Sequence, residues 1–85
     1  MEAPLNQKPF KGVIRDWWRD GGVVSGICVW HADAVPISAH AVLHEEIVAG
    51  EAMHTSWVVN ILDFDTFSIL QTRRSYYVLI EPRKA

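Results

Sequence analysis

The sequence predicts a mainly β protein, either a small, strongly bent antiparallel sheet or an SH3-like barrel of about five strands, with one short helical insertion. Short runs rich in β-branched and aromatic residues are separated by turn signals at hairpin spacing. A chain of 85 residues, 49% of them hydrophobic, can build one core but is too short for two domains. We therefore expect an extended N-terminal arm over residues 1–10 and a single β domain over residues 11–85, with a short helix at about 38–49.

The start of the domain is predicted to be a β-hairpin. Residues 12–20 fit a helical spacing as well as a strand. The choice of strand follows from the Asp20-Gly21-Gly22 turn signal and from residues 23–31, which are rich in β-branched residues and too short for a helix. Pairing of these two runs is the simplest interpretation.

The helical insertion is predicted from residues in the middle of the chain that interrupt strands or begin and end helices. Pro36 blocks regular strand pairing, Ser38 can cap a short helix, and Gly50 can end it.

Residues 53–62 carry the clearest strand pattern, and we expect a central strand that is partly buried on both faces. Trp57 and Val59 share one face of it, so the pattern predicts that they are buried together. In that case Trp57→Ala should cost roughly 3 to 5 kcal/mol. Two further strands are predicted over residues 66–72 and 75–80, the second ended by Pro82.

Composition narrows the compartment and the partner classes. Cys28 is the only cysteine, and the N-terminus lacks the basic start and apolar run of a secretory signal, so we expect the cytoplasm, which would be the host cytoplasm for a phage-encoded protein. No apolar run approaches the roughly 20 residues of a membrane span, so a membrane partner is not expected. The formal net charge of −2 disfavours nucleic acid as a partner. A small domain can gain stability from a second copy, which makes a homodimer a further expectation.

Positive charge is confined to the two ends of the chain. Residues 20–72 contain no lysine or arginine, although they include several carboxylates. If the two ends lie together in the fold, one side of the surface is basic and the other acidic. The basic residues are Lys8, Lys11, Arg15, Arg19, Arg73, Arg74, Arg83 and Lys84.

The sequence offers only weak candidates for a catalytic or metal-binding site. His40 and His44 have an i, i+4 spacing, but they lack further ligands and the stronger HExxH pattern. His54 and Ser56, two apart on one strand, would lie about 6.6 Å apart, beyond hydrogen-bond reach. We therefore expect no enzyme activity, no catalytic or metal-binding residues and no cofactor.

The most informative pattern is the alternation of arginine with large aromatics in RDWWR (residues 15–19) and TRRSYYV (residues 72–78). These residue types are enriched in interface hot spots, and aromatics flanked by arginine also stack single-stranded bases. In each adjacent aromatic pair a strand sends one ring inward, so packing accounts for half of the rings. The predicted partner-binding residues are Arg15, Trp17, Trp18, Arg19, Arg73, Arg74, Tyr76 and Tyr77.

Three segments, VSGICVWH, GEAMHTSWVVNI and TRRSYYVLIEP, resemble a group of small uncharacterised proteins encoded by phages and prophages of proteobacteria. The resemblance covers residues 13–82 and implies a compact β fold in a phage or mobile-element setting, without an activity. The leading hypothesis is a non-catalytic protein-binding module that acts on a host or phage protein. The alternatives are a small β-barrel that binds single-stranded nucleic acid and, third, a metal-dependent or hydrolytic enzyme.

Overall fold

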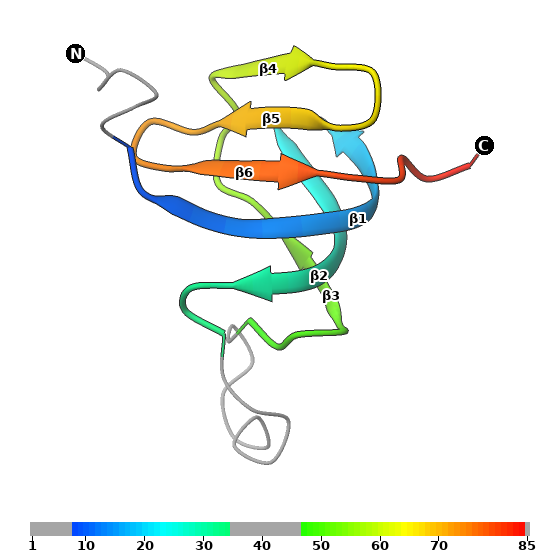
Figure 1. Ribbon diagram of the computed structural model, residues 1–85. Coiled ribbons are helices and arrows are strands. Elements are labelled where there is room, and N and C mark those ends of the chain that lie inside the picture. Colours follow the sequence, from blue (N-terminus) through cyan, green and yellow to red (C-terminus); the bar gives the residue numbers. More distant parts are fainter. Residues whose placement is uncertain (1–7, 35–46, 85) are drawn as a thin grey trace.

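The computed structural model describes residues 8–34 and 47–84, which form one six-stranded mixed sheet (Figure 1). The strand order is β3-β2-β1-β6-β5-β4. The mainly β class is confirmed. The strands are β1 (Phe10–Asp20), β2 (Val23–His31), β3 (Ala52–His54), β4 (Asn60–Asp63), β5 (Ser68–Gln71) and β6 (Tyr76–Leu79).

The predicted hairpin is present. Strands β1 and β2 pair antiparallel around a turn in which Gly21 has a φ of +66°, a conformation that glycine adopts without steric cost. The described end of the predicted arm also belongs to the sheet. Phe10 is the first residue of β1, and the Pro9 carbonyl accepts a hydrogen bond from the Tyr76 backbone N–H at 3.0 Å.

The expectation of a purely antiparallel sheet is wrong at one pairing. Strands β1 and β6 run parallel, with Phe10 opposite Tyr76 and Ile14 opposite Leu79, whereas the other four pairings are antiparallel. The reason is the turn after β5, which returns the chain to the end of the sheet where β1 begins. The first and last strands are therefore neighbours, as expected, but with the opposite relative direction.

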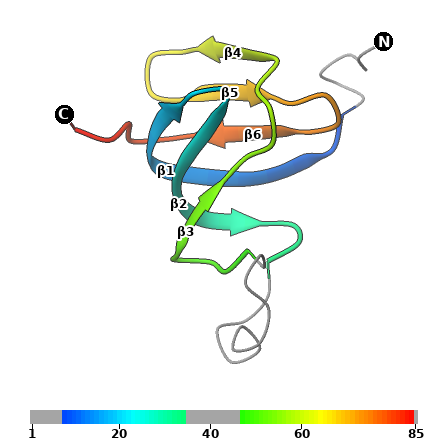
Figure 2. The same ribbon diagram turned by 180° about the vertical axis from the view of Figure 1, so that it is seen from behind.

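The predicted central strand over residues 53–62 is also wrong. The chain leaves β3 after His54, crosses the face of the sheet that is turned toward the viewer in Figure 2, and joins the opposite edge as β4. The Val58 N–H donates to the Gly22 carbonyl at 2.8 Å, and the next N–H, that of Val59, donates to the Gln71 carbonyl at 2.8 Å. Two adjacent residues thus bridge β5 and the turn before β2, which requires a strongly bent sheet.

An SH3-like barrel is not supported, because β3 and β4 are the two edges of the sheet and do not pair with each other. The connection over residues 55–59 spans the distance between them instead. The bend itself has a local cause in β1, where the pairing with β2 shifts register between Arg15 and Trp18. Asp16, in this bulge, has a φ of +50° and donates its N–H to the Glu81 carbonyl at 2.7 Å.

The helical insertion is not supported by the described residues. Most of the predicted segment, residues 38–46, lies outside them together with His40 and His44. Residues 47–49 are described and are not helical, since Val48 forms a β-bridge and a turn follows at Ala49 and Gly50. Among the residues described there is no helix long and apolar enough to cross a membrane.

The core lies where the bent sheet folds over itself. Its buried residues come from five of the six strands. Gly26 of β2 lies opposite the bulge of β1, and a Cβ atom there would lie 2.5 Å from Ile14 Cγ2 and 2.8 Å from the Arg15 carbonyl oxygen. The buried cluster consists of Ile14, Val24, Cys28, Met53, Leu70, Tyr77 and Leu79.

Candidate functional site

Most side chains of residues 15–19 form contacts within the molecule. Arg15 forms an ion pair with Asp16, and Trp17 packs against the core cluster. The guanidinium of Arg83 lies 4.0 Å from the centroid of the Trp18 ring, within range of a cation–π contact. Arg19, at the end of β1, is exposed.

The tyrosine pair divides as the alternation of a strand requires. Tyr77 is buried in the core. Tyr76 is half-buried and lies 5.3 Å, between ring centroids, from Phe10, which stacks on Trp30 at 5.4 Å. Rings from three neighbouring strands therefore form a cross-strand ladder, an arrangement that stabilises sheets.

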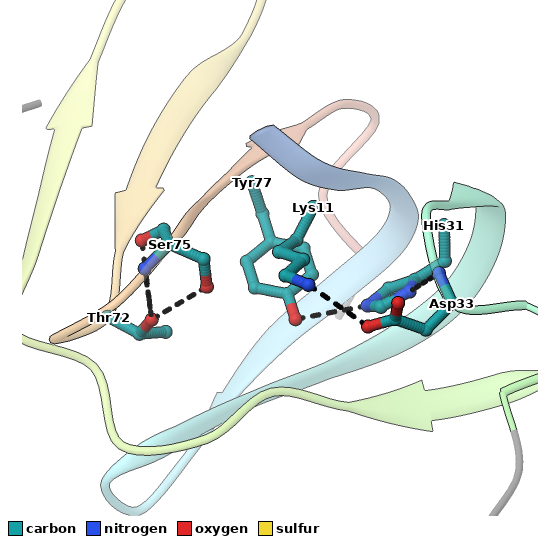
Figure 3. A network of polar contacts seen from close by, with 6 residues as sticks. All are labelled: Lys11, His31, Asp33, Thr72, Ser75 and Tyr77. Atoms are coloured by element: carbon teal, nitrogen blue, oxygen red, sulfur yellow. Dashed lines mark hydrogen bonds and ion pairs between the residues drawn. The ribbon is translucent and has the colours of Figure 1, made fainter. Parts of the chain in front are cut away.

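The Tyr77 hydroxyl belongs to a polar network between β6 and β2 (Figure 3). The Asp33 backbone N–H donates to His31 Nδ1 at 3.0 Å, so Nε2 carries the hydrogen and donates it to the Tyr77 hydroxyl at 3.1 Å. Lys11 forms an ion pair with Asp33 at 3.1 Å. Burial lowers the pKa of His31 and raises the pKa of Tyr77, so both stay neutral near pH 7. Buried and neutral, these side chains tie two strands together.

The parallel register keeps the predicted arginines apart. Arg15 follows Ile14, which is opposite Leu79, whereas Arg73 precedes β6. At about 3.3 Å per residue, Arg15 and Arg73 are separated by roughly 20 Å along the direction of these two strands. The structure therefore does not gather Arg15 and Arg19 into one patch with Arg73 and Arg74.

Arg73 and Arg74 instead lie beside Trp57, which the sequence analysis assigned to the core. Together with Ser56, Thr72 and Ser75 these three residues line a groove of about 250 Å³, called the Trp57 groove below. Trp57 is 71% exposed, so its predicted burial with Val59 is wrong. Its indole lies over Gly22, where a Cβ atom would be only 1.7 Å from Trp57 Cζ3. Only glycine leaves room for the ring in this position.

The backbone around Trp57 is fixed on both sides. The Thr55 N–H donates to the Val24 carbonyl at 2.8 Å, and the Thr55 hydroxyl accepts from the Val24 N–H at 3.1 Å. After Trp57, the Val58 N–H is bonded to the Gly22 carbonyl, and the Val58 side chain packs on the core. The indole is thus an exposed ring on a rigid segment.

The turn over residues 72–75, called the arginine turn below, is also held by hydrogen bonds. The Thr72 N–H donates to the Ser75 carbonyl at 2.9 Å, the Ser75 N–H donates to Thr72 Oγ1 at 3.1 Å, and the two hydroxyls lie 2.9 Å apart. The buried Lys8 ammonium donates to the Thr72 carbonyl at 2.8 Å. Arg73 and Arg74 project from this turn and are exposed, and neither forms an ion pair within the part of the chain that the structure describes.

The groove combines a flat apolar ring, two guanidinium groups and hydroxyl-bearing walls, which suits a ligand with carboxylates or phosphates next to a flat or apolar group. Across residues 8–34 and 47–84, no three His, Cys, Asp or Glu side chains are placed to hold a metal ion.

Comparison with protein-family models, with curated proteins and with solved structures finds no match.

Proposed function

We propose that this chain is a non-catalytic protein-binding module that holds an acidic, aromatic-containing segment of a partner protein in the Trp57 groove. The observation that carries the proposal is the exposed indole of Trp57, seated on Gly22 beside the exposed guanidinium groups of Arg73 and Arg74. Of the eight residues predicted from the sequence, the proposal keeps these two arginines and adds Trp57. The resemblance to phage and prophage proteins favours a host or phage protein as the partner.

Physical chemistry supports this choice of ligand. Tryptophan and arginine are the side chains that most often dominate interface energies, and a guanidinium binds a carboxylate through two parallel hydrogen bonds. Because the backbone on both sides of the groove is already held by hydrogen bonds, binding orders the two arginine side chains but little of the backbone.

The test is fluorescence anisotropy with three labelled peptides: one acidic with phenylalanines, one acidic without aromatics, and one with lysines in place of the acidic residues. We expect the first to bind most tightly. Replacing both Arg73 and Arg74 with Ala should weaken it by about 2 kcal/mol, roughly 30-fold. Arg83→Ala is the control, because Arg83 is an exposed arginine that lies on Trp18 beyond the other end of β6. Equal affinity of the double variant and the parent protein would contradict the proposal.

Single-stranded nucleic acid is a second candidate, favoured by the same juxtaposition of an exposed ring and two arginines, since bases stack on aromatic side chains. An oligothymidylate in the same assay separates the two. If nucleic acid is the ligand, the oligonucleotide should bind more tightly than the acidic peptide, and its affinity should fall steeply with salt.

A further inference from the structure

The hairpin tip between β4 and β5, residues 63–67, has the composition that the Trp57 groove is proposed to bind. Its sequence is Asp-Phe-Asp-Thr-Phe. Phe64 is 52% exposed and Phe67 is 37% exposed, and their rings stack with centroids 4.9 Å apart. Asp65 is exposed and forms no hydrogen bond or ion pair within the described residues. Asp63 is also exposed, and one oxygen of its carboxylate accepts a hydrogen bond from the Ser68 hydroxyl at 2.7 Å. This acidic tip therefore presents the free Asp65 carboxylate and the second oxygen of Asp63 next to two exposed aromatic rings.

The tip and the groove cannot meet within one molecule. The tip precedes the first residue of β5 and the arginine turn follows the last, so the two lie beyond opposite ends of the same strand (Figure 1). From Phe67 to Thr72 the backbone covers roughly 17 Å at about 3.3 Å per residue. No residue of the tip lines the Trp57 groove. A contact between them requires two copies of the chain.

The charges of the two surfaces are complementary. The tip lies within the 53 residues that contain no lysine or arginine, and it carries Asp63 and Asp65. The groove carries Arg73 and Arg74, with neither arginine neutralised by a carboxylate in the described part of the chain. Such opposite charges steer two copies into a tip-to-groove encounter and disfavour tip-to-tip and groove-to-groove contacts.

We propose that the protein self-associates head to tail, with the acidic tip of one copy bound in the Trp57 groove of the next. The proposal rests on the ligand preference proposed above for the groove. In this arrangement Phe64 packs against the Trp57 indole, and the carboxylates bind the two guanidinium groups. Because the two surfaces differ, each bound copy leaves one tip and one groove free, so the association extends to larger assemblies or closes into a ring. The contact is small, so the association is reversible and depends on concentration.

Sedimentation velocity from about 10 µM to 1 mM protein tests the proposal. The weight-average mass of the parent protein should rise with concentration at low salt and fall back at 0.5 M NaCl, where the charges are screened. A groove variant (Arg73→Ala with Arg74→Ala) and a tip variant (Phe64→Ser with Asp65→Asn) should each remain monomeric. An equimolar mixture should form a one-to-one dimer and nothing larger, because only one intact tip and one intact groove remain.

Controls keep the outcome informative. Asp20→Asn changes an exposed carboxylate in another hairpin turn and should associate like the parent protein. Thermal melts establish that each variant folds, and Asp65→Asn alone replaces the tip variant if the double substitution does not fold. A parent protein that stays monomeric at 1 mM, or variants that fail to recover association when mixed, would overturn the proposal. If the monomeric protein still binds the acidic aromatic peptide through Arg73 and Arg74, only the self-association falls and the proposed function stands.

Discussion

The Trp57→Ala substitution separates the exposed position seen in the structure from the buried position that the strand pattern predicts. Trp57 is 71% exposed, so about three-tenths of its surface is covered. A tryptophan that is fully buried removes about 150 to 250 Å² from water, so the covered part is about 45 to 75 Å². At about 25 cal/mol per Å², its loss costs about 1 to 2 kcal/mol, an upper estimate because the unfolded chain also covers apolar surface. A core tryptophan would cost roughly 3 to 5 kcal/mol.

Urea denaturation followed by far-UV circular dichroism measures this difference, since the midpoint is read from the loss of the backbone signal and does not rely on tryptophan fluorescence. Leu70→Ala provides the benchmark within the same protein, because Leu70 is fully buried and its truncation should cost about 2 to 5 kcal/mol. A loss of 3 kcal/mol or more for Trp57→Ala would refute the exposed position of the ring and, with it, the proposed groove. A loss near 1 kcal/mol together with weakened peptide binding agrees with the proposed role.

Three further predictions concern the network, the core and the arginine turn. Burial lowers the pKa of His31 below its ordinary value of about 6.5, so the unfolded chain takes up the proton first as the pH falls. The free energy of unfolding should therefore be constant above pH 6.5 and decline below it. In urea titrations at several pH values, His31→Gln should flatten that decline. Gly26→Ala forces a Cβ against Ile14 and the β1 backbone and should cost about 1 to 3 kcal/mol by chemical denaturation, whereas an unchanged midpoint would mean that the β1 bulge does not pack closely on Gly26. Lys8→Met removes the hydrogen bond to the Thr72 carbonyl and should speed amide hydrogen exchange in the arginine turn, with unchanged exchange arguing that Lys8 does not support it.

Local patterns predicted the elements whose signals are themselves local. The β1–β2 hairpin follows from the Asp20-Gly21-Gly22 turn between two β-rich runs, and the structure contains it. The division of Tyr76 and Tyr77 into an outer and an inner ring follows from the alternation of side chains along a strand. The prediction that first and last strands are neighbours also held, but the parallel direction depends on where the preceding turn returns the chain.

The Trp57 region shows where local pattern fails. Met53 and Thr55 are buried and His54 and Ser56 are exposed, so the alternation of a strand continues to Ser56 and fails at Trp57, which is exposed. The physical cause is a long-range one: hydrogen bonds to Val24, Gly22 and Gln71 draw the chain off the edge of β2 and across to the edge of β5. The alternation of side chains persists only while a segment remains in a strand.

By itself, the sequence determined the β class, the first hairpin, the separation of charge along the chain and the arginine and aromatic residue types available for binding. Each of these depends on residues close together in the chain. Tertiary structure decided which of those residues meet, because strand direction and register between β1 and β6 set Arg15 roughly 20 Å from the level of Arg73. It also placed Trp57 over Gly22, residues 35 positions apart in the sequence, since only the strong bend of the sheet brings the start of β2 and the connection after β3 into contact.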